Sequence, residues 1–189
     1  MSSPTPDNKT VAKTAAAAFG GNPTVHQYGN GKDGYYLGVL TSEDCPNDGL
    51  ISFCTIGLSD LAVPGVLDPP LGVELVATSN DPKFAGVLTT AGYHMTHDHW
   101  TAEPDNLFAD IVADEFGEVT TPHLFLVTPY LWSGLGSIEL TTKTVAFVMG
   151  IPITKAERRL FKERGADALS DALEAGDPDI IDLQRESVA

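Results

Sequence analysis

Two uninterrupted apolar runs, at residues 124–127 and 144–149, limit the possible folds of this chain more than any other feature. A run without alternating polar residues is typical of a strand that is covered on both faces. Such strands lie inside a sheet and need other layers on both sides. We therefore expect both runs to be central strands of a sheet that helices flank.

The remaining elements follow from turn and capping signals. Helices are expected at residues 10–19, which Gly20 and Gly21 end, and at 81–100, 154–164 and 166–174. Thr154 and Glu157 have the spacing of a capping box at the start of the third of these helices. Strands at 24–28 and 35–40 are expected to form a hairpin around residues 29–34. Two more strands are expected at 50–56 and 73–78, on either side of a loop at 63–72. Residues 180–183 are expected to form a short strand or an extended tail.

The order of these elements predicts the fold class. Helices and strands do not alternate regularly, which favours an α+β fold with a mixed, mainly antiparallel sheet flanked by helices. A length of 189 residues fits a single domain. We expect residues 1–9, which are polar and contain proline, to form a flexible N-terminus, and residues 10–189 to form the domain.

The charge of the chain argues against two kinds of partner. Its 26 acidic and 11 basic side chains give a formal net charge of −15. Nucleic acids and anionic membranes are bound through clustered Lys and Arg, so we expect neither as a partner. The N-terminus lacks the pattern of a secretory signal, and Cys45 and Cys54 lack the spacing of a zinc site or a disulfide framework. We therefore expect a soluble, cytoplasmic protein.

The acidic side chains are unevenly placed. No Lys or Arg lies between Lys83 and Lys143, and a second acidic run follows between residues 167 and 182. The basic residues gather instead at Lys155, Arg158, Arg159, Lys162 and Arg164. The acidic runs fit either solvated faces or a surface that attracts a basic protein partner. On charge density alone, the candidate contacts for such a partner are Glu103, Asp105, Asp110, Asp114 and Glu115.

The histidine-rich segment 94–99 raises the alternative of a metal-dependent hydrolase. Its ligands would be His94, His97 and His99, with Asp98 as a further ligand or a base. The spacing opposes this reading on a regular element, because on a helix the last histidine lies away from the first two, and on a strand the first points away from the others. A loop could still gather all three, with His123 or His26 as a further ligand. Because a helix is expected at 81–100, we expect no metal or other cofactor.

Residues 57–61 resemble the G-x-S-x-G nucleophile elbow, with Ser59 in the position of the nucleophile. Leu61 replaces the second glycine, so a simple turn at the end of a strand is the better interpretation. Tyr130 and Trp132 follow the first apolar run, where they would either anchor a partner or seal the edge of the core.

Three segments follow one another along the chain: residues 55–60 (TIGLSD), 129–132 (PYLW) and 179–188 (DIIDLQRESV). With other segments from about residue 10 to residue 189, they resemble the suppressor of fused-like domain in its short bacterial form, and the first and last of the three are its most specific parts. The resemblance implies binding rather than catalysis, since bacterial single-domain relatives act as immunity proteins that neutralise a toxin, often a nuclease. A regulatory binding module unrelated to toxins remains an alternative.

The same resemblance implies structural roles for the motif residues. These residues are Gly57, Leu58, Ser59, Asp60, Trp132, Asp182 and Arg185. Asp60 is expected to cap a turn, Trp132 to seal the core and Arg185 to pair with an acidic side chain. None is expected to be catalytic, and the expected partner is a basic toxin protein.

Overall fold

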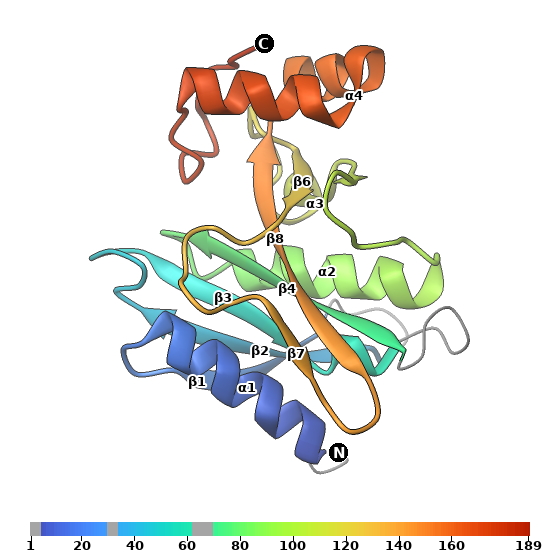
Figure 1. Cartoon of the computed structure of the whole chain (residues 1–189). Helices are drawn as coiled ribbons and strands as arrows, with labels where there is room; N and C mark the ends of the chain where they lie inside the picture. Colours follow the sequence, from blue (N-terminus) through green and yellow to red (C-terminus); the bar gives the residue numbers. More distant parts are fainter. Residues whose placement is uncertain (1–4, 30–33, 62–69) are drawn as a thin grey trace.

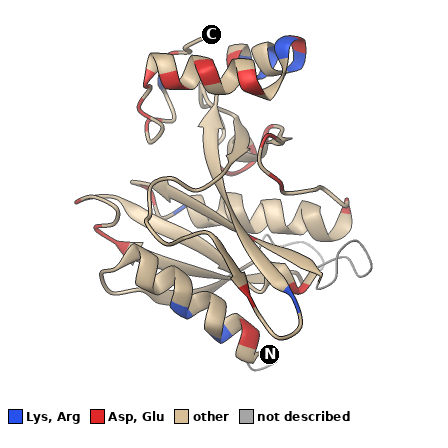
Figure 2. Cartoon of the chain, viewed as in Figure 1, with Lys and Arg blue, Asp and Glu red and all other residues tan. Residues whose placement is uncertain are grey.

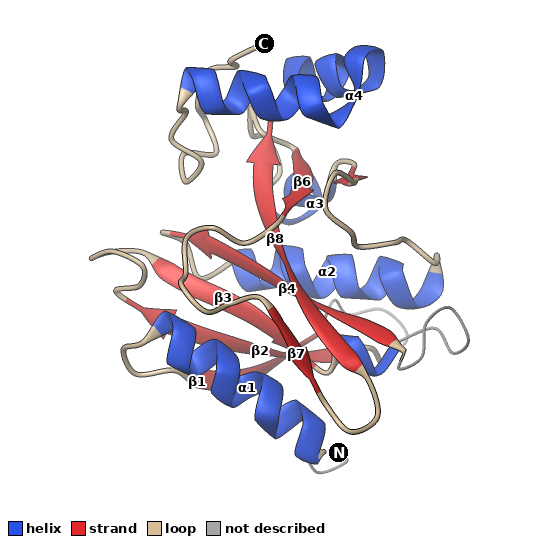
Figure 3. Cartoon of the chain, viewed as in Figure 1, coloured by secondary structure: helices blue, strands red, loops and turns tan. Residues whose placement is uncertain are grey.

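The computed structural model describes residues 5–29, 34–61 and 70–189. In these residues one mixed sheet of eight strands is combined with four α-helices (Figures 1 and 3). The strand order is β1-β2-β3-β4-β8-β6-β5, and β7 pairs with β8 outside this path. Since β4 and β8 are parallel and the other strand pairs are antiparallel, the expected single α+β domain with a mainly antiparallel sheet is confirmed.

The strands are β1 (Thr24–Gly29), β2 (Tyr36–Glu43), β3 (Ile51–Ile56), β4 (Leu71–Ser79), β5 (Leu107–Phe108), β6 (His123–Val127), β7 (Ser137–Glu139) and β8 (Thr144–Ile153). The two apolar runs form β6 and the first part of β8, as expected. Burial on both faces explains why neither strand shows an alternating pattern. β1 and β2 form the expected hairpin, although residues 30–33 of its turn lie outside the described residues.

The helices are α1 (Pro6–Phe19), α2 (Phe84–His97), α3 (Ile111–Phe116) and α4 (Lys155–Gly176). The apolar residues of α2 and α3 pack in one core, and those of α1 and α4 pack in a second core with Trp132. In Figure 1, α1 and α2 lie on opposite faces of the sheet, and β8 leads from the sheet centre to α4. The two cores therefore lie on the two sides of one sheet.

Several predicted element ends, and the prediction for residues 180–183, differ from the structure. Residues 6–9, expected in a flexible N-terminus, form the first part of α1, because the Thr5 hydroxyl accepts a hydrogen bond from the Asn8 amide and caps the helix. α2 ends at His97 rather than residue 100, and His99 has a positive φ of 57°. Residues 180–183 form turns rather than a strand.

The two helices expected after residue 154 are present as two segments of α4. Gly165 separates them, with a φ of 87° that glycine adopts at little cost. The capping box is also confirmed, since the Thr154 hydroxyl accepts from the Glu157 amide and the Glu157 carboxylate accepts from the Thr154 amide.

Three short elements were not predicted from the sequence. β5 has two residues, α3 has six and β7, farther along the chain, has three. Elements this short contain less than two helical turns or a few strand residues, so periodicity cannot reveal them. In the described part of the chain, no helix has the length and apolar character needed to cross a lipid bilayer.

Candidate partner-binding surface

A groove of about 650 Å³ lies between the second segment of α4 and the end of β6. We call it the α4–β6 groove. Its apolar walls include Phe125, Val127, Leu131, Ile151 and Leu173, and its polar side chains include Tyr130, Glu174 and Asp177. The groove therefore combines an apolar floor with two carboxylates, which suits an apolar side chain that has a basic neighbour.

Tyr130 gives this groove an aromatic contact residue. Its side chain is 60% exposed, in contrast to Trp132, which is buried two positions later. Burial of part of the ring, with a smaller contribution from the Asp177 carboxylate, raises the pKa of the Tyr130 phenol, so the hydroxyl stays protonated as a hydrogen-bond donor. Exposed tyrosines that line a concave surface are frequent contact residues in protein interfaces.

Two acidic residues of the second run, Glu174 and Asp177, line this groove, and the others lie outside it. Asp167, Asp171, Glu174, Asp177, Asp179 and Asp182 are all exposed. In Figure 2, acidic positions (red) recur along the second segment of α4, and basic positions (blue) mark the end of the first segment. The kink at Gly165 therefore separates an acidic half of α4 from a basic half.

The five acidic residues chosen from charge density do not share one environment. Glu103, Asp105 and Asp114 are exposed. The Glu115 carboxylate lies against Gly86, where an added Cβ would come within 2.5 Å of it, and the Lys83 ammonium donates to the Glu115 carbonyl. Asp110 is exposed but lies beside basic residues of α4. Of the five, only Glu103, Asp105 and Asp114 are exposed carboxylates away from the basic residues of α4 and from Gly86.

The segment 57–60 is a turn that a buried carboxylate holds in place. Glu74 of β4 is fully buried, and its carboxylate accepts hydrogen bonds from the amides of Gly57, Leu58 and Ser59 and from the Thr55 hydroxyl. Burial raises the pKa of Glu74, and these hydrogen bonds offset part of that rise. The turn is thus capped by Glu74.

Asp60 has a different role from the expected turn cap. Its carboxylate pairs with the Lys143 ammonium at 2.6 Å and accepts from the Asn8 side-chain amide at 3.1 Å. Lys143 also donates to the Ser59 hydroxyl, and Ser59 is fully buried. These contacts join α1, the 57–60 turn and the start of β8, and they leave Ser59 without the access that a nucleophile needs.

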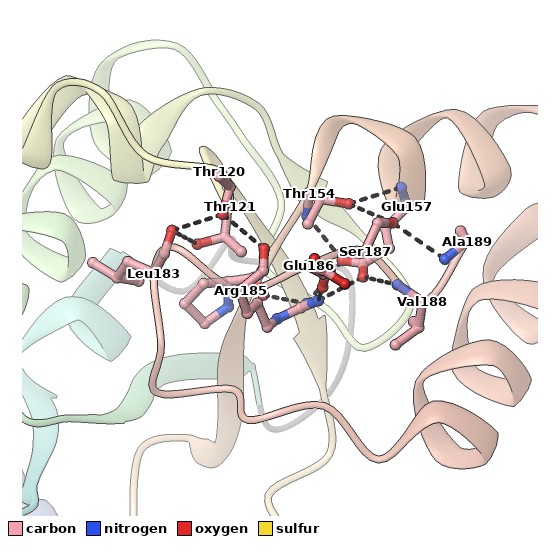
Figure 4. A network of polar contacts seen from close by, with 11 residues as sticks. Thr120, Thr121, Thr154, Glu157, Leu183, Arg185, Glu186, Ser187, Val188 and Ala189 are labelled. Carbon is pink, nitrogen blue, oxygen red and sulfur yellow. Dashed lines mark hydrogen bonds and ion pairs between the residues drawn. The ribbon is translucent and has the colours of Figure 1, made fainter.

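Arg185 connects the C-terminal segment to the start of α4 (Figure 4). Its guanidinium donates to both oxygens of the fully buried Glu157 carboxylate, at 2.6 and 2.8 Å. The same carboxylate accepts from the amides of Thr154 and Val188. Burial alone would raise the pKa of Glu157, but Arg185 and these amides outweigh it and lower the pKa.

The other two motif residues lie at contrasting depths. Trp132 is buried against Phe19, with ring centroids 4.9 Å apart, and its indole N–H donates to the Ser52 hydroxyl. Asp182 is exposed, and its carboxylate accepts from the Gln184 amide in a local turn. Both residues organise the chain around them and neither lies in the α4–β6 groove.

The histidines of the 94–99 segment are not brought together as metal ligands. His94 pairs with Asp98 and stacks on Trp100, whereas His97 stacks on Tyr93 and lies next to its carbonyl. His99 follows the end of α2 with left-handed backbone geometry. Within the described ranges, no three His, Cys, Asp or Glu side chains are grouped to hold a metal ion.

Sequence reasoning missed Glu74 and Lys143. Glu74 had a detectable signal, because it is the single charged residue in the apolar strand 73–78. A charge in such a strand has to find several hydrogen-bond donors once it is buried. Lys143 had no comparable signal, since its partners are 83 and 84 positions away.

Comparison with known proteins identifies relatives along the whole chain. The chain is 33% identical over 188 residues to the immunity protein YqcF of Bacillus subtilis, an alignment that covers 97% of this chain and 98% of that protein. The family model described as "Suppressor of fused protein (SUFU)" matches residues 33–186.

Solved structures share the fold at lower sequence identity. A putative SUFU homologue from Neisseria gonorrhoeae has a TM-score of 0.71 at 16% identity over 96% of both chains. A chain of the Sufu–Fu complex has a TM-score of 0.71 at 15% identity, over 98% of this chain and 93% of that one. Drosophila Suppressor of Fused has a TM-score of 0.59 at 13% identity, over 81% of this chain and 42% of that one.

The structural likenesses concern the fold alone, whereas the family match covers residues 33–186 and the sequence alignment with YqcF covers nearly the whole chain. The resemblance seen in the TIGLSD and C-terminal segments is thereby confirmed. The chain belongs to the suppressor of fused (SUFU) family.

Proposed function

We propose that this chain is a cytoplasmic immunity protein that neutralises a toxin protein by direct binding. The observation that carries the proposal is the end-to-end similarity to the immunity protein YqcF, at 33% identity over 188 residues. The described residues support binding over bond-breaking chemistry, because Ser59 is buried and the three histidines of the 94–99 segment are not grouped around a common point.

The α4–β6 groove is the proposed contact surface. An apolar side chain of the toxin would fill the floor of the groove, beside Tyr130, and a neighbouring Lys or Arg would meet Glu174 and Asp177. Complementary charge of this kind favours a toxin with a basic active-site cleft, as a nuclease needs for its phosphate substrate. Binding would block that cleft sterically.

Glu103, Asp105 and Asp114 are proposed to attract the toxin before contact. They are exposed, and the chain has a formal net charge of −15. Like-signed surface charges raise the association rate with a basic partner, and salt screens this effect. Replacing all three with amides should slow association at low ionic strength and leave dissociation unchanged.

The first experiment identifies the partner and tests what it does. The tagged chain is used to capture proteins from its native cells at low salt, and each captured protein is then expressed alone and together with this chain. The expected result is a basic protein that stops growth when expressed alone and is harmless with this chain. If no captured protein is toxic, the immunity function is wrong and a binding module unrelated to toxins becomes the better interpretation.

Substitutions then test the groove. Tyr130→Ala should weaken toxin binding by about 30-fold, as truncation of a central aromatic contact does, and Glu174→Gln with Asp177→Asn by about tenfold. Asp171→Asn is the matched control, since Asp171 lies on the same helix but lines a different surface pocket. If the groove variants bind and protect as well as the control, the toxin binds elsewhere.

A further inference from the structure

A second pocket, of about 290 Å³, lies between the first segment of α4 and the start of β6. We call it the basic pocket. It is lined by Asp110, His123, Lys155, Arg158, Arg159 and Lys162. Four cationic side chains and one carboxylate give its walls a formal charge of about +3 in a chain whose net charge is −15, so the positive potential here is local.

His123 supplies this pocket with a buried hydrogen-bond donor. The side chain is 1% exposed, and its Nδ1 accepts a hydrogen bond of 2.9 Å from the Asp110 amide. A ring nitrogen that accepts a hydrogen bond carries no proton, so the neutral ring carries its proton on Nε2. The described residues offer that N–H no acceptor. A buried donor without an acceptor is unfavourable, and an incoming anion would remove that penalty by accepting its hydrogen bond.

Arg158 supplies a second such donor. Its Nε atom is buried and has no hydrogen-bond partner among the described residues. The guanidinium group presents its donors in a planar fork that matches two oxygens of one anion. Lys155 and Lys162 are exposed and add mobile charges at the mouth of the pocket. Lys155 is also the first residue of α4, where the free amides of a helix favour negative charge.

The electrostatics of the imidazole agree with this geometry. Burial lowers the pKa of His123, and the positive charges of Arg158, Lys155 and Lys162 lower it further against the opposing effect of Asp110. The ring is therefore neutral at neutral pH, which keeps the single proton on Nε2. The same positive charges that disfavour a charged imidazole favour a bound anion.

We propose that the basic pocket binds a phosphate group, with Arg158, Lys155 and Lys162 as its charged partners and the His123 Nε2–H as a neutral donor. A phosphate dianion matches the excess positive charge, and its several oxygens match donors that come from β6 and from α4. A carboxylate carries one charge and would be satisfied by Arg158 alone. The basic pocket is separate from the α4–β6 groove, so phosphate binding can be tested independently of the proposed toxin contact.

The test is a titration of the full chain with inorganic phosphate, followed by NMR at the His123 Nε2–H resonance and by calorimetry. Sodium chloride at matched ionic strength controls for general screening. The expected result is a saturable shift of the His123 resonance with phosphate and none with chloride. No saturable shift in the millimolar range would overturn the proposal. Acetate binding as tightly as phosphate would overturn the choice of phosphate over carboxylate.

Substitutions assign the site. Lys162→Gln and Arg158→Gln should each weaken phosphate binding by about fivefold to tenfold, because each removes one charge-assisted contact. Lys162 is exposed, so its variant is expected to fold normally even if that of the half-buried Arg158 does not. Arg164→Gln is the matched control, since it removes the same charge from the same helix outside this pocket. An equal loss in the Arg164 variant would mean that phosphate senses only the overall charge.

Discussion

Two fully buried carboxylates hold the two motif segments of this domain in place by different means. Glu157 is paired with the Arg185 guanidinium and thereby fastens the C-terminal segment to α4. Glu74 has four neutral donors, three backbone amides and the Thr55 hydroxyl, and thereby fastens the 57–60 turn to β4. The pKa of Glu157 is lowered and that of Glu74 is raised, although burial acts in the same direction on both.

The difference shows what a charged partner adds. In both sites, hydrogen bonds favour the ionised carboxylate and burial disfavours it. Only at Glu157 does a full positive charge tip the balance toward ionisation. Glu157 and Arg185 therefore form an ion pair. Glu74 is bound by neutral donors alone, and its raised pKa means that it is protonated more readily than an ordinary carboxyl group.

The largest expected effect is that of Glu157→Gln. It leaves the buried Arg185 guanidinium without a counter-charge, and removal of one partner from a buried pair costs about 3–5 kcal/mol. Chemical denaturation should show this loss of unfolding free energy, with release of the C-terminal segment. Glu163→Gln, an exposed change on the same helix, should stay within about 0.5 kcal/mol of the wild type. Equal stability of both variants would contradict the ion-pair interpretation.

Glu74→Gln should have the next largest effect, about 2–3 kcal/mol. The amide keeps the size of the side chain but directs an NH₂ group toward backbone N–H donors that then lack an acceptor. The measurement is again the unfolding free energy, with exposed Glu139→Gln as the control. A loss larger than that of Glu157→Gln would reverse the ranking of the two sites.

Asp60→Asn should cost about 1–2 kcal/mol, because the variant leaves the buried Lys143 ammonium without its counter-charge, although the Asp60 carboxylate itself is partly exposed. The Asp60 carboxylate is partly exposed, and Lys143 keeps its hydrogen bond to Ser59 when the charge of Asp60 is removed. Thermal unfolding of the Asp60→Asn and Glu74→Gln variants, measured side by side, would show which of the two carboxylates stabilises the 57–60 turn more. Equal losses would mean that the partly exposed Asp60 carboxylate stabilises the turn as much as the buried Glu74 does.

The smallest expected effect is the pH dependence of stability, which has opposite signs at the two sites and falls in different pH ranges. The raised pKa of Glu74 means that wild-type stability relative to Glu74→Gln increases as pH falls through that pKa toward the ordinary 4.5. The lowered pKa of Glu157 means that wild-type stability relative to Glu157→Gln is constant above about 4.5 and decreases below it. Denaturation at several acidic pH values tests both signs, and parallel curves for the two variants would contradict the assignment.

Local signals predicted much of the secondary structure. The apolar runs correspond to β6 and β8, the Thr154–Glu157 spacing marked the start of α4, and Gly165 marked its kink. The elements that were not predicted are short, such as α3 with its six residues. The candidate site was harder to predict. The sequence indicated Tyr130 as a possible partner contact, but it did not show that this residue lies beside Glu174 and Asp177.

The fold class and the order of the main helices and strands could be predicted from the sequence, because propensity, capping and apolar patterning act between neighbouring residues, and the motif segments indicated the family. Which charges meet depends on the three-dimensional fold. The fold pairs Glu157 with Arg185 across 28 positions and places Glu74 under a turn 15 to 17 positions away. It also divides the acidic residues between a groove, a basic pocket and open surface. The energy of a charge depends on its burial and on neighbours in space, which composition and spacing do not contain.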